Sequence, residues 1–220
     1  MNPATTPVRP DDDGATPPWP SRPLGELCDL RSSPAVGKDA RTTDDGVPFV
    51  LPRDLKGQRI TRTENTTLTH ETAHRLRGHA LASGDLLMTR TGTVGSCALV
   101  TGAESGWLHH MNLIRLRPRR TGDGGVLVSP SYLVACLSAT AARTWIGTRS
   151  AGMVIPSISM QALASFQVPL PPLEEQQRIG RTLAALDEKI RLHTEIVNTT
   201  KELRSVVADL LVTGNLLAGP

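Results

Sequence analysis

The feature that most constrains this chain is a long helical segment near its C-terminus, which follows a run of prolines. Residues 168–172 read Val-Pro-Leu-Pro-Pro. Proline can neither continue a strand ladder nor enter a helix interior, so this run separates two structural units. Beyond it, no Gly or Pro interrupts residues 181–213, and Gly214 is a natural helix stop. The sequence therefore predicts one helix over residues 174–212, about 58 Å long at roughly 1.5 Å per residue.

Apolar residues recur along this helix at the alternating three- and four-residue spacing of a coiled-coil seam. The residues that we predict to mediate dimerisation are Ile179, Leu183, Leu186, Ile190, Ile196, Leu203, Val206 and Leu210. The second part of the stripe starts one residue early, at Leu192. A helix of this length cannot bury such a stripe against one compact domain, so we expect it to need a partner helix.

The preceding region has the pattern of a mixed α+β domain. Short apolar runs alternate with Gly, Pro, Asp and Asn, which are typical of turns between strands. The predicted strands are residues 47–50, 86–88, 98–100 and 114–117. In the last of these, apolar and charged residues alternate, which places Arg115 and Arg117 on one face of a sheet.

One helix of this domain has a clear start. Ser129 can cap it, Pro130 suits its first position, and Leu133, Leu137 and Ala141 share a face. The predicted fold is therefore α+β: a mixed-sheet domain followed by one long helix of the coiled-coil type. We assign residues 1–20 to a disordered tail, 21–170 to the domain, 171–214 to the long helix and 215–220 to a second tail.

Charge is unevenly spread along the chain, which has a formal net charge of +3 and a pI of about 9.0. Residues 53–120 hold eleven Lys and Arg against five Asp and Glu. Such a basic stretch can attract nucleic acid, although it can equally be a solvated face. The chain has only six aromatic residues, too few for a platform that stacks single-stranded bases.

The compartment follows from what the sequence lacks. No apolar run approaches the roughly 18 to 20 residues that a membrane-spanning helix needs. The first residues have no apolar core of the kind found in a signal peptide. Cys28, Cys97 and Cys136 stand far apart, in neither disulfide nor zinc-ligand spacing. We therefore expect a protein of the reducing cytoplasm, with no membrane partner.

Three sequence blocks occur in a fixed order. The first is Gly46–Val50 with the following Arg53-Asp54-Leu55, and the second is Gly84–Gly95. The third is Pro169–Ile179, which runs into Leu186–Ile190. Together, over about residues 19–214, they resemble the DNA-specificity (S) subunit of type I restriction-modification enzymes.

The resemblance implies a target recognition domain followed by a spacer helix. Members of the family usually carry two such units, each reading half of a split double-stranded DNA sequence, and dock methyltransferase (M) subunits on the paired helices. This chain resembles a half-length S subunit. It is expected to form a homodimer or to pair with another half-subunit, unless it is an inactive recognition cassette.

The same resemblance implies a non-catalytic protein, cytoplasmic and associated with the nucleoid. S-adenosylmethionine, ATP and Mg²⁺ are expected only in partner subunits, which are the M subunits and, where present, the restriction or translocase (R) subunits. No cofactor or metal is expected in this chain.

The candidate DNA contacts come from the basic stretch and from polar loops at residues 56–65, 89–95, 109–112 and 148–153. A reader of base edges needs such loops on a rigid scaffold. The predicted DNA-binding residues are Arg53, Lys56, Arg59, Arg62, Thr89, Arg90, Thr91, Thr93, Asn112 and Arg149. The glycines at 92 and 95 are expected to form a tight turn with positive φ.

An enzymatic alternative rests on residues 70–74, which read His-Glu-Thr-Ala-His. This matches the HExxH pattern, in which two histidines bind zinc and the glutamate activates water. A zinc hydrolase using His70, Glu71 and His74 is therefore the rival hypothesis. The extended motif would need a glycine and a third histidine where the chain has Arg77 and Ala80, so we favour surface or DNA-facing histidines.

Overall fold

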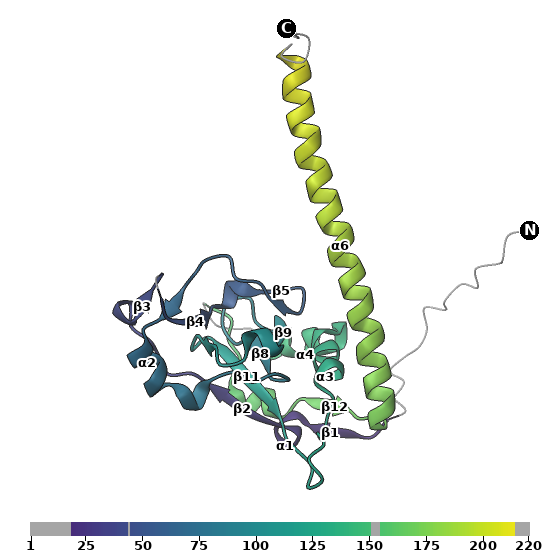
Figure 1. Cartoon of the computed structure of the whole chain (residues 1–220). Helices are drawn as coiled ribbons and strands as arrows, with labels where there is room; N and C mark the ends of the chain where they lie inside the picture. The colour runs from purple at the N-terminus through teal and green to yellow at the C-terminus, as the bar shows by residue number, and fades with distance from the viewer. Residues whose placement is uncertain (1–18, 44, 151–154, 214–220) are drawn as a thin grey trace, which may run out of the picture.

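The computed structural model describes residues 19–43, 45–150 and 155–213. It shows a mixed-sheet domain from which one long helix rises (Figure 1), so the predicted fold class is confirmed. Residues 1–18 and 214–220, which hold most of the two predicted tails, lie outside the described residues. Among the described residues, no helix is both long and apolar enough to cross a membrane.

The larger sheet is antiparallel and has the strand order β2-β11-β8-β9. Its strands are Cys28–Ser32 (β2), Leu113–Pro118 (β11), Leu86–Thr89 (β8) and Cys97–Leu99 (β9). Of these, β8, β9 and β11 lie where the sequence predicted strands. Leu86, Ile114 and Leu116 are fully buried in the main core, which explains their apolar pattern.

The helices of the domain cover this core. They are Leu24–Leu27 (α1), Pro130–Ser138 (α3), Thr140–Ser150 (α4) and Met160–Ala164 (α5). The predicted helix that starts at Pro130 is shorter than its apolar pattern indicates, because Ala139 adopts an extended conformation and ends it. Leu133 and Leu137 are buried as predicted, but Ala141 is an exposed residue of α4. Ser129 makes no side-chain cap.

A smaller lobe is built on a mixed sheet with the order β10-β4-β7-β3, in which β10 and β4 are parallel. Its elements are Leu108–His109 (β10), Val47–Val50 (β4), Thr67–Leu68 (β7), Arg41–Thr42 (β3), His70–Arg75 (α2), and the 3-10 helices Lys38–Ala40 and Arg77–His79. Phe49, Leu68 and Leu108 form its core.

Arg115 and Arg117 lie between the two sheets. They share one face, as predicted, and both donate to the carbonyl oxygen of Ala80, at 3.4 and 3.2 Å. Arg115 is fully buried and lies 3.5 Å from Asp29. Arg117 makes two 2.7 Å hydrogen bonds to the buried carboxylate of Asp85, although its own side chain is 41% exposed. Arg115 is therefore a structural charge of the core, whereas Arg117 is a partly exposed residue that is paired within the domain.

The chain enters and leaves the domain at the same place. Ser21–Pro23 (β1) pairs antiparallel with Gln167–Pro169 (β12), the strand that immediately precedes the long helix. Leu170 N donates to Pro20 O at 2.7 Å and extends this pairing. The prolines of the run at residues 168–172 thus stand at the last residue of β12, Pro169, and in the link to the helix, Pro171 and Pro172, where proline is tolerated.

The long helix, Leu173–Val212 (α6), packs closely on the domain near its start. Gln176 is buried, accepts from Ser129 N at 2.9 Å and donates to Pro171 O at 2.9 Å. Gly180 packs so closely on α3 that an added Cβ would lie 2.4 Å from the Ser131 hydroxyl oxygen. Ile179, predicted as a dimerisation residue, instead packs partly buried against the main core.

A two-stranded hairpin, Leu55–Lys56 (β5) and Arg59–Ile60 (β6), lies between the larger sheet and α6. It follows a 3-10 turn at Pro52–Asp54, and another 3-10 turn, Gly102–Glu104, follows β9. Leu99 N donates to Gln58 O at 3.0 Å, which joins the hairpin to the edge strand β9.

Candidate nucleic-acid interface

One end of the larger sheet gathers three segments that are far apart in the sequence. They are the turn after β8, the residues before β11 and the residues before α5. Arg90 N donates to Asn112 O at 2.9 Å, and Gly92 N donates to Pro156 O at 3.0 Å. We call this the loop-end surface; its residues are Arg90, Thr91, Thr93, Met111, Asn112 and 155–157.

The loop-end surface has the composition of a base-reading site. Arg90 is half-buried, and its Nε atom has no hydrogen-bond partner within the described part of the chain. Thr91 pairs with Ser157, while Thr93 is exposed. Met111 and Ile155 are exposed apolar residues beside these polar groups. Arginine and asparagine are the side chains that pair bidentately with guanine and adenine, and apolar groups contact the thymine methyl.

Thr89 does not belong to this surface, contrary to the sequence prediction. It is only 2% exposed, and its hydroxyl group bonds the backbone of Thr93 and accepts from Ser96 N at 3.0 Å. The hydroxyl closes the glycine turn from within. Gly92 and Gly95 have φ of +77° and +91°, as expected for glycines in a tight turn.

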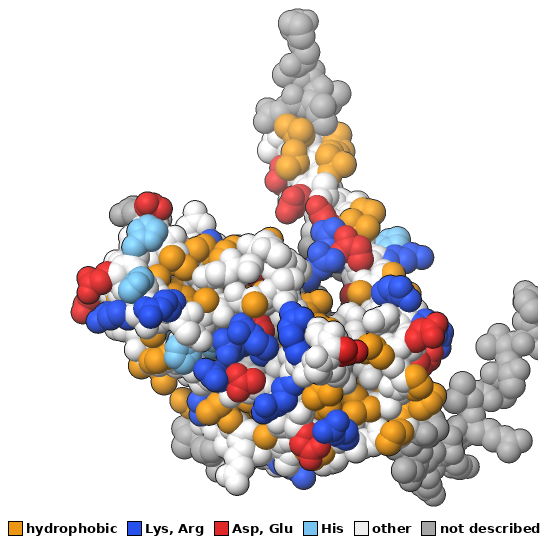
Figure 2. Space-filling model, turned by 60° about the horizontal axis from the view of Figure 1, so that its bottom comes forward, with side chains coloured by type: hydrophobic (Ala, Val, Ile, Leu, Met, Phe, Trp, Pro, Cys, Tyr) orange, Lys and Arg blue, Asp and Glu red, His pale blue; other side chains and the backbone are white. Residues whose placement is uncertain are grey.

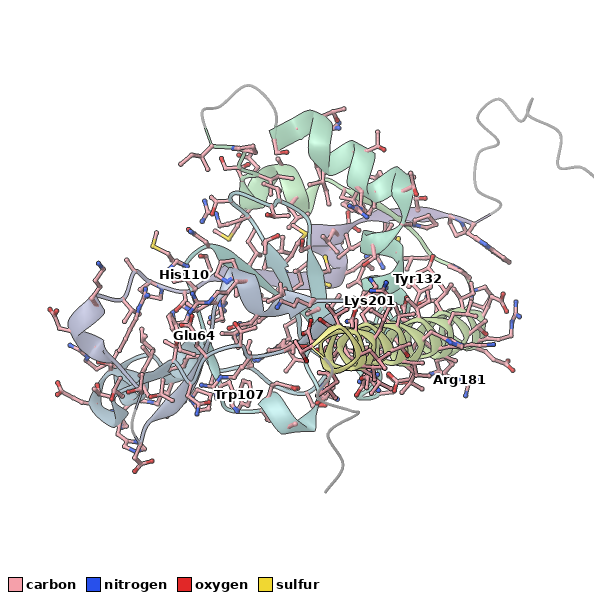
Figure 3. All side chains as sticks on the ribbon, turned by 90° about the horizontal axis from the view of Figure 1, so that it is seen from above. Glu64, Trp107, His110, Tyr132, Arg181 and Lys201 are labelled. Carbon is pink, nitrogen blue, oxygen red and sulfur yellow. The ribbon has the colours of Figure 1, made fainter. Side chains whose placement is uncertain are left out.

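The structure places the cations of the predicted basic stretch in different surroundings. Arg53 pairs with Glu64, and Arg62 lies 5.3 Å from the Trp107 ring centroid and donates to Thr66 O at 2.9 Å. Seen from above, Glu64, Trp107 and His110 lie toward the smaller lobe, whereas Tyr132 lies beside α6 (Figure 3). These contacts neutralise or occupy the two arginines, so they are weaker candidates for DNA contact than the sequence suggests.

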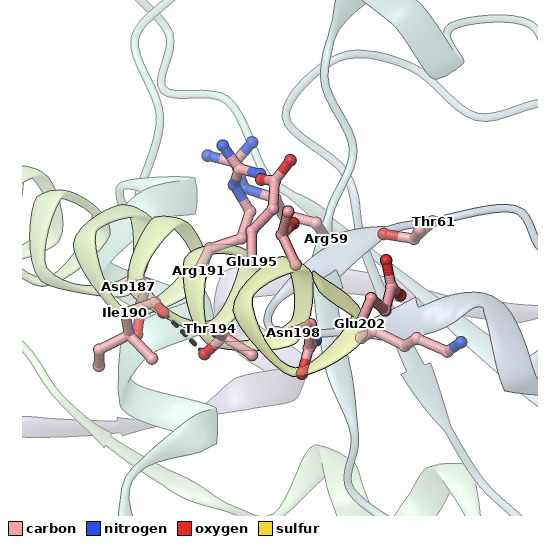
Figure 4. Close-up of a pocket in the computed structure, with 12 residues that line it drawn as sticks. Arg59, Thr61, Asp187, Ile190, Arg191, Thr194, Glu195, Asn198 and Glu202 are labelled. Carbon is pink, nitrogen blue, oxygen red and sulfur yellow. Dashed lines mark hydrogen bonds and ion pairs between the residues drawn. The ribbon is translucent and has the colours of Figure 1, made fainter. Parts of the chain in front are cut away.

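Arg59 and Lys56 face the long helix. Arg59 donates to Glu188 of α6 at 2.7 Å. Lys56 and Arg59 line a groove of about 550 Å³ between the hairpin and α6 (Figure 4). The side chain of Arg59 thus has a partner within the protein. Contact of Lys56 and Arg59 with DNA stays a prediction.

Arg149 lies on α4, not on a loop as predicted, and its guanidinium lies 3.9 Å from the Trp145 ring centroid. The same helix carries Arg143, which the sequence reasoning missed. Arg143 and Thr93 line a polar groove of about 310 Å³ that runs from the glycine turn to the hairpin. Only the tertiary fold brings Arg143 there, because no local motif surrounds it.

The histidines collect in and around the smaller lobe. Of the six histidines, five are at positions 70, 74, 79, 109 and 110, and Figure 2 shows His side chains gathered with Lys and Arg at one end of the domain. His70 and His74 are exposed on α2, and His70 Nε2 lies 3.5 Å from Asp45. Within the described ranges, no group of three or more His, Cys, Asp or Glu could hold a metal ion. The zinc hydrolase alternative therefore has no support in this part of the chain.

His109 differs from the exposed histidines, because it is fully buried. Burial lowers the pKa of its imidazole to about 4, with a smaller opposing effect from a backbone hydrogen bond at His110. Burial likewise lowers the pKa of His110, and the nearby Arg41 lowers it further. At neutral pH His109 is an uncharged core residue, which no local sequence pattern indicates.

Most of α6 presents an apolar face that the domain leaves open. Leu186 is 52% and Ile190 64% exposed, and with His193 and Val197 they line a shallow groove along the helix. Of the predicted dimerisation residues, Leu183, Ile196, Leu203 and Val206 are also exposed, and Leu210 is half-buried. Dimerisation itself remains a prediction.

The predicted stripe does not lie on one face of α6. At about 100° per residue, Val197 is on the same side as Leu186, whereas Ile196 is turned about 80° away. The sequence reasoning therefore missed His193 and Val197 as members of the first face. The apolar residues Leu192, Ile196, Leu203, Val206 and Leu210 form a second face.

Comparisons with known proteins show which family this chain matches. Residues 17–202 match the family model described as type I restriction modification DNA specificity domain. A protein of Methanocaldococcus jannaschii described as type I restriction enzyme MjaX specificity subunit is 26% identical in an alignment of 188 residues that covers 80% of this chain and 43% of that protein.

Solved structures show the same fold. The HsdS subunit of Thermoanaerobacter tengcongensis has a TM-score of 0.59 and 22% identity over 83% of this chain and 41% of its own. The type I restriction-modification S subunit of M. genitalium has a TM-score of 0.57 and 15% identity, over 93% and 47%. A chain of a type I R-M system solved to show complex assembly has a TM-score of 0.63 and 22% identity, over 91% and 47%. The chain spans less than half the length of these relatives.

Proposed function

Because the chain belongs to the family of type I restriction modification DNA specificity domains, we propose that it is the sequence-recognition subunit of a type I restriction-modification complex. The observation that carries this proposal is the pairing of two features. One recognition-type domain presents Arg90, Thr91 and Asn112 at one end of a rigid sheet, and a 40-residue helix follows it directly.

Recognition would occur at the loop-end surface. Arg90 N donates to Asn112 O, Arg90 O accepts from Ile158 N, and the adjacent residues Thr89 and Leu113 are paired in the sheet, so the two side chains project from a rigid base. Their chemistry suits direct reading of base edges in the major groove. Other cations of the domain, such as Arg143, would position the phosphate backbone without specifying sequence.

One domain of this kind reads a short half-site, which by itself gives little discrimination across a genome. Two copies that pair their α6 helices antiparallel would place two domains at opposite ends of a rod about 60 Å long. Such a homodimer would read a palindromic split site, and pairing with a different half-subunit would read an asymmetric one. The exposed apolar face of α6 supports either arrangement.

In this proposal the chain has no catalytic step of its own. M subunits dock along the paired helices and supply S-adenosylmethionine chemistry, and R subunits, where present, use ATP and Mg²⁺. The contribution of this chain is to bind double-stranded DNA and to fix which adenine or cytosine the partner can reach.

Methylome sequencing tests the proposal. A host that expresses an M subunit from the same genome is compared with and without this chain, and a split motif should be methylated only when both are present. A chain that binds the M subunit but directs no methylation would show an inactive cassette. A chain that neither binds the M subunit nor changes the methylome would overturn the proposal.

A further inference from the structure

The β5–β6 hairpin makes a second, separate contact between the domain and α6. Gln58 Nε2 donates to Asp187 Oδ2 at 2.8 Å, and Arg59 donates to Glu188 Oε2 at 2.7 Å. Glu188 is also bonded by Arg191 at 2.8 Å. Figure 4 shows Arg59 reaching the flank of α6 where Arg191 and Glu195 lie. This contact lies two helical turns beyond the anchor at Gly180.

The backbone of the hairpin turn is adapted to this contact. Gly57 and Gln58 form the two-residue turn, with φ of +54° and +62°. Within the described ranges, Gln58 is the only residue other than glycine with positive φ. A glycine or asparagine would adopt this conformation with less strain. Gln58, however, has a side chain long enough to reach Asp187, and strained residues of this kind cluster at functional positions.

Two points of attachment determine the tilt of a rod that one point leaves free. We infer that the β5–β6 hairpin is a brace that sets the angle of α6 relative to the recognition domain, and thereby the spacing between the two DNA half-sites. The inference rests on the proposed function, because spacing has meaning only in a paired reader. Gln58, Arg59, Asp187 and Glu188 are positioning residues in this account and do not touch DNA.

The lever arm shows why a small contact matters. Gly180 is about 10 Å from Asp187 along the helix axis and about 48 Å from Val212. A shift of about 1 Å at the brace therefore moves the far end of α6 by roughly 5 Å. This exceeds the rise of one base pair, about 3.4 Å. Weakening the brace should thus broaden the range of spacer lengths at which the complex methylates DNA.

Distance measurement by electron spin resonance tests the brace directly. Spin labels at Glu71→Cys, on the domain, and Ser205→Cys, on α6, report the angle between them in the full chain. Labelled chain is diluted with unlabelled chain so that only distances within one copy are seen. The same chain without the two added cysteines controls for labelling of the native thiols.

Gln58→Gly keeps the positive φ of the turn and removes the side chain, and Asp187→Ala removes its acceptor. Both should broaden the distance distribution. Asp187→Asn keeps an acceptor oxygen, and Glu174→Gln changes an exposed helix carboxylate away from the hairpin. These two matched controls should leave the distribution unchanged. An unchanged distribution in both Gln58→Gly and Asp187→Ala would overturn the inference, whatever their methylation activity.

The functional consequence is measured with the M subunit on DNA sites whose spacers differ by one base pair. The ratio of methylation at the preferred spacer to that at the next one should fall by about tenfold in Gln58→Gly, with the half-site sequences unchanged. Broadened distances with an unaltered spacer ratio would overturn the link to spacing. A parent chain that directs no methylation at any spacer would contradict the proposed function and leave the distance result to decide the brace.

Discussion

At the scale of single residues, the surroundings of each charge decide what the charge can do. The guanidiniums of Arg115 and Arg117 are bound within the domain by Asp29, Asp85 and a shared carbonyl, Arg115 fully buried and Arg117 partly exposed. Arg90 is half-buried at the loop-end surface, beside Thr91 and Asn112. Composition treats these arginines alike, although Arg115 and Arg117 hold the two sheets together and Arg90 lies at the end of the larger sheet.

Replacing Arg90 with Ala should change sequence recognition. A good base contact is worth about 1 to 3 kcal/mol of discrimination, so Arg90→Ala should methylate its motif roughly tenfold more slowly or relax one position of it. The measurement is methylome sequencing with the M subunit present. Arg22→Ala is the matched control, since Arg22 is an exposed arginine that pairs with Glu26 at 3.0 Å. If both variants keep the parent motif and rate, Arg90 is not a base contact.

His109 should make the domain sensitive to mild acid. The unfolded chain binds a proton near pH 6.5, whereas the folded pKa is about 4. As pH falls below about 6.5, the unfolded state binds a proton that the folded state does not yet bind. The free energy of unfolding therefore falls until the folded histidine titrates. The loss attributable to His109 is about 3 kcal/mol between these limits.

Urea unfolding across pH 7 to 4 measures this loss. His109→Phe should flatten the acid limb of the stability profile, because it removes the titrating group from the core. His74→Ala, at an exposed histidine of α2, serves as the control and should retain the parent slope. An acid limb that is equally steep in His109→Phe would assign the sensitivity to other groups.

At the scale of elements, the join between α3 and α6 depends on the absence of one side chain. Gly180→Ala puts a Cβ 2.4 Å from Ser131 and 2.8 Å from the backbone of Tyr132, which forces the two helices apart. Overpacking of this kind costs about 1 to 3 kcal/mol. Thermal unfolding should show a clear fall in Tm.

Gly147 in α4 provides the matched control, since an added Cβ there meets nothing within 4 Å. Gly147→Ala should raise stability by about 0.5 to 1 kcal/mol, the usual gain in a helix interior. Equal effects of the two substitutions would mean that α6 does not depend on close contact at Gly180.

The elements also show which parts of the fold can be predicted from sequence. The strands at Val47–Val50 and Leu86–Thr89 and the helix Leu173–Val212 carry local patterns, and all three were predicted. The pairing of β1 with β12, the break at Ala139 and the brace from Gln58 to Asp187 depend on partners far along the chain. Local periodicity carries no information about such partners.

The candidate site divides in the same way. Arg90, Thr91 and Asn112 were predicted because they flank strands with turn residues. Thr89 and Arg59 were assigned to DNA because their internal partners, Ser96 and Glu188, cannot be seen in a local window. Arg143 was missed for the converse reason, since only the packing of α4 brings it beside the glycine turn.

At the scale of the whole molecule, the predicted dimer can form through either of the two apolar faces of α6. The groove with Leu186, Ile190, His193 and Val197 is continuous, whereas Ile196 belongs to the second face. If the first face forms the dimer, Val197→Asp should bury a charge and raise the dimer dissociation constant by at least about tenfold. Ile196→Asp should have a smaller effect.

Light scattering over a concentration series measures both variants against the parent. His193→Leu extends the apolar face and should tighten the dimer. A parent chain that stays monomeric at micromolar concentration, also with its M subunit present, would contradict the homodimer and favour pairing with a different half-subunit. A larger effect of Ile196→Asp than of Val197→Asp would assign the contact to the second face.

The pairing of β1 with β12 has a consequence for how such readers can diversify. Because the chain enters and leaves the domain through the two paired strands β1 and β12, the domain is joined to α6 through these two strands as one unit. The surfaces that the helix requires of it are few, chiefly the close contact at Ser131 and the tip of the hairpin. If the chain has the proposed function, recombination within residues 21–169 would replace the whole domain while α6 is inherited unchanged, and a new DNA specificity would arise by exchange of the domain, without a slow accumulation of point mutations.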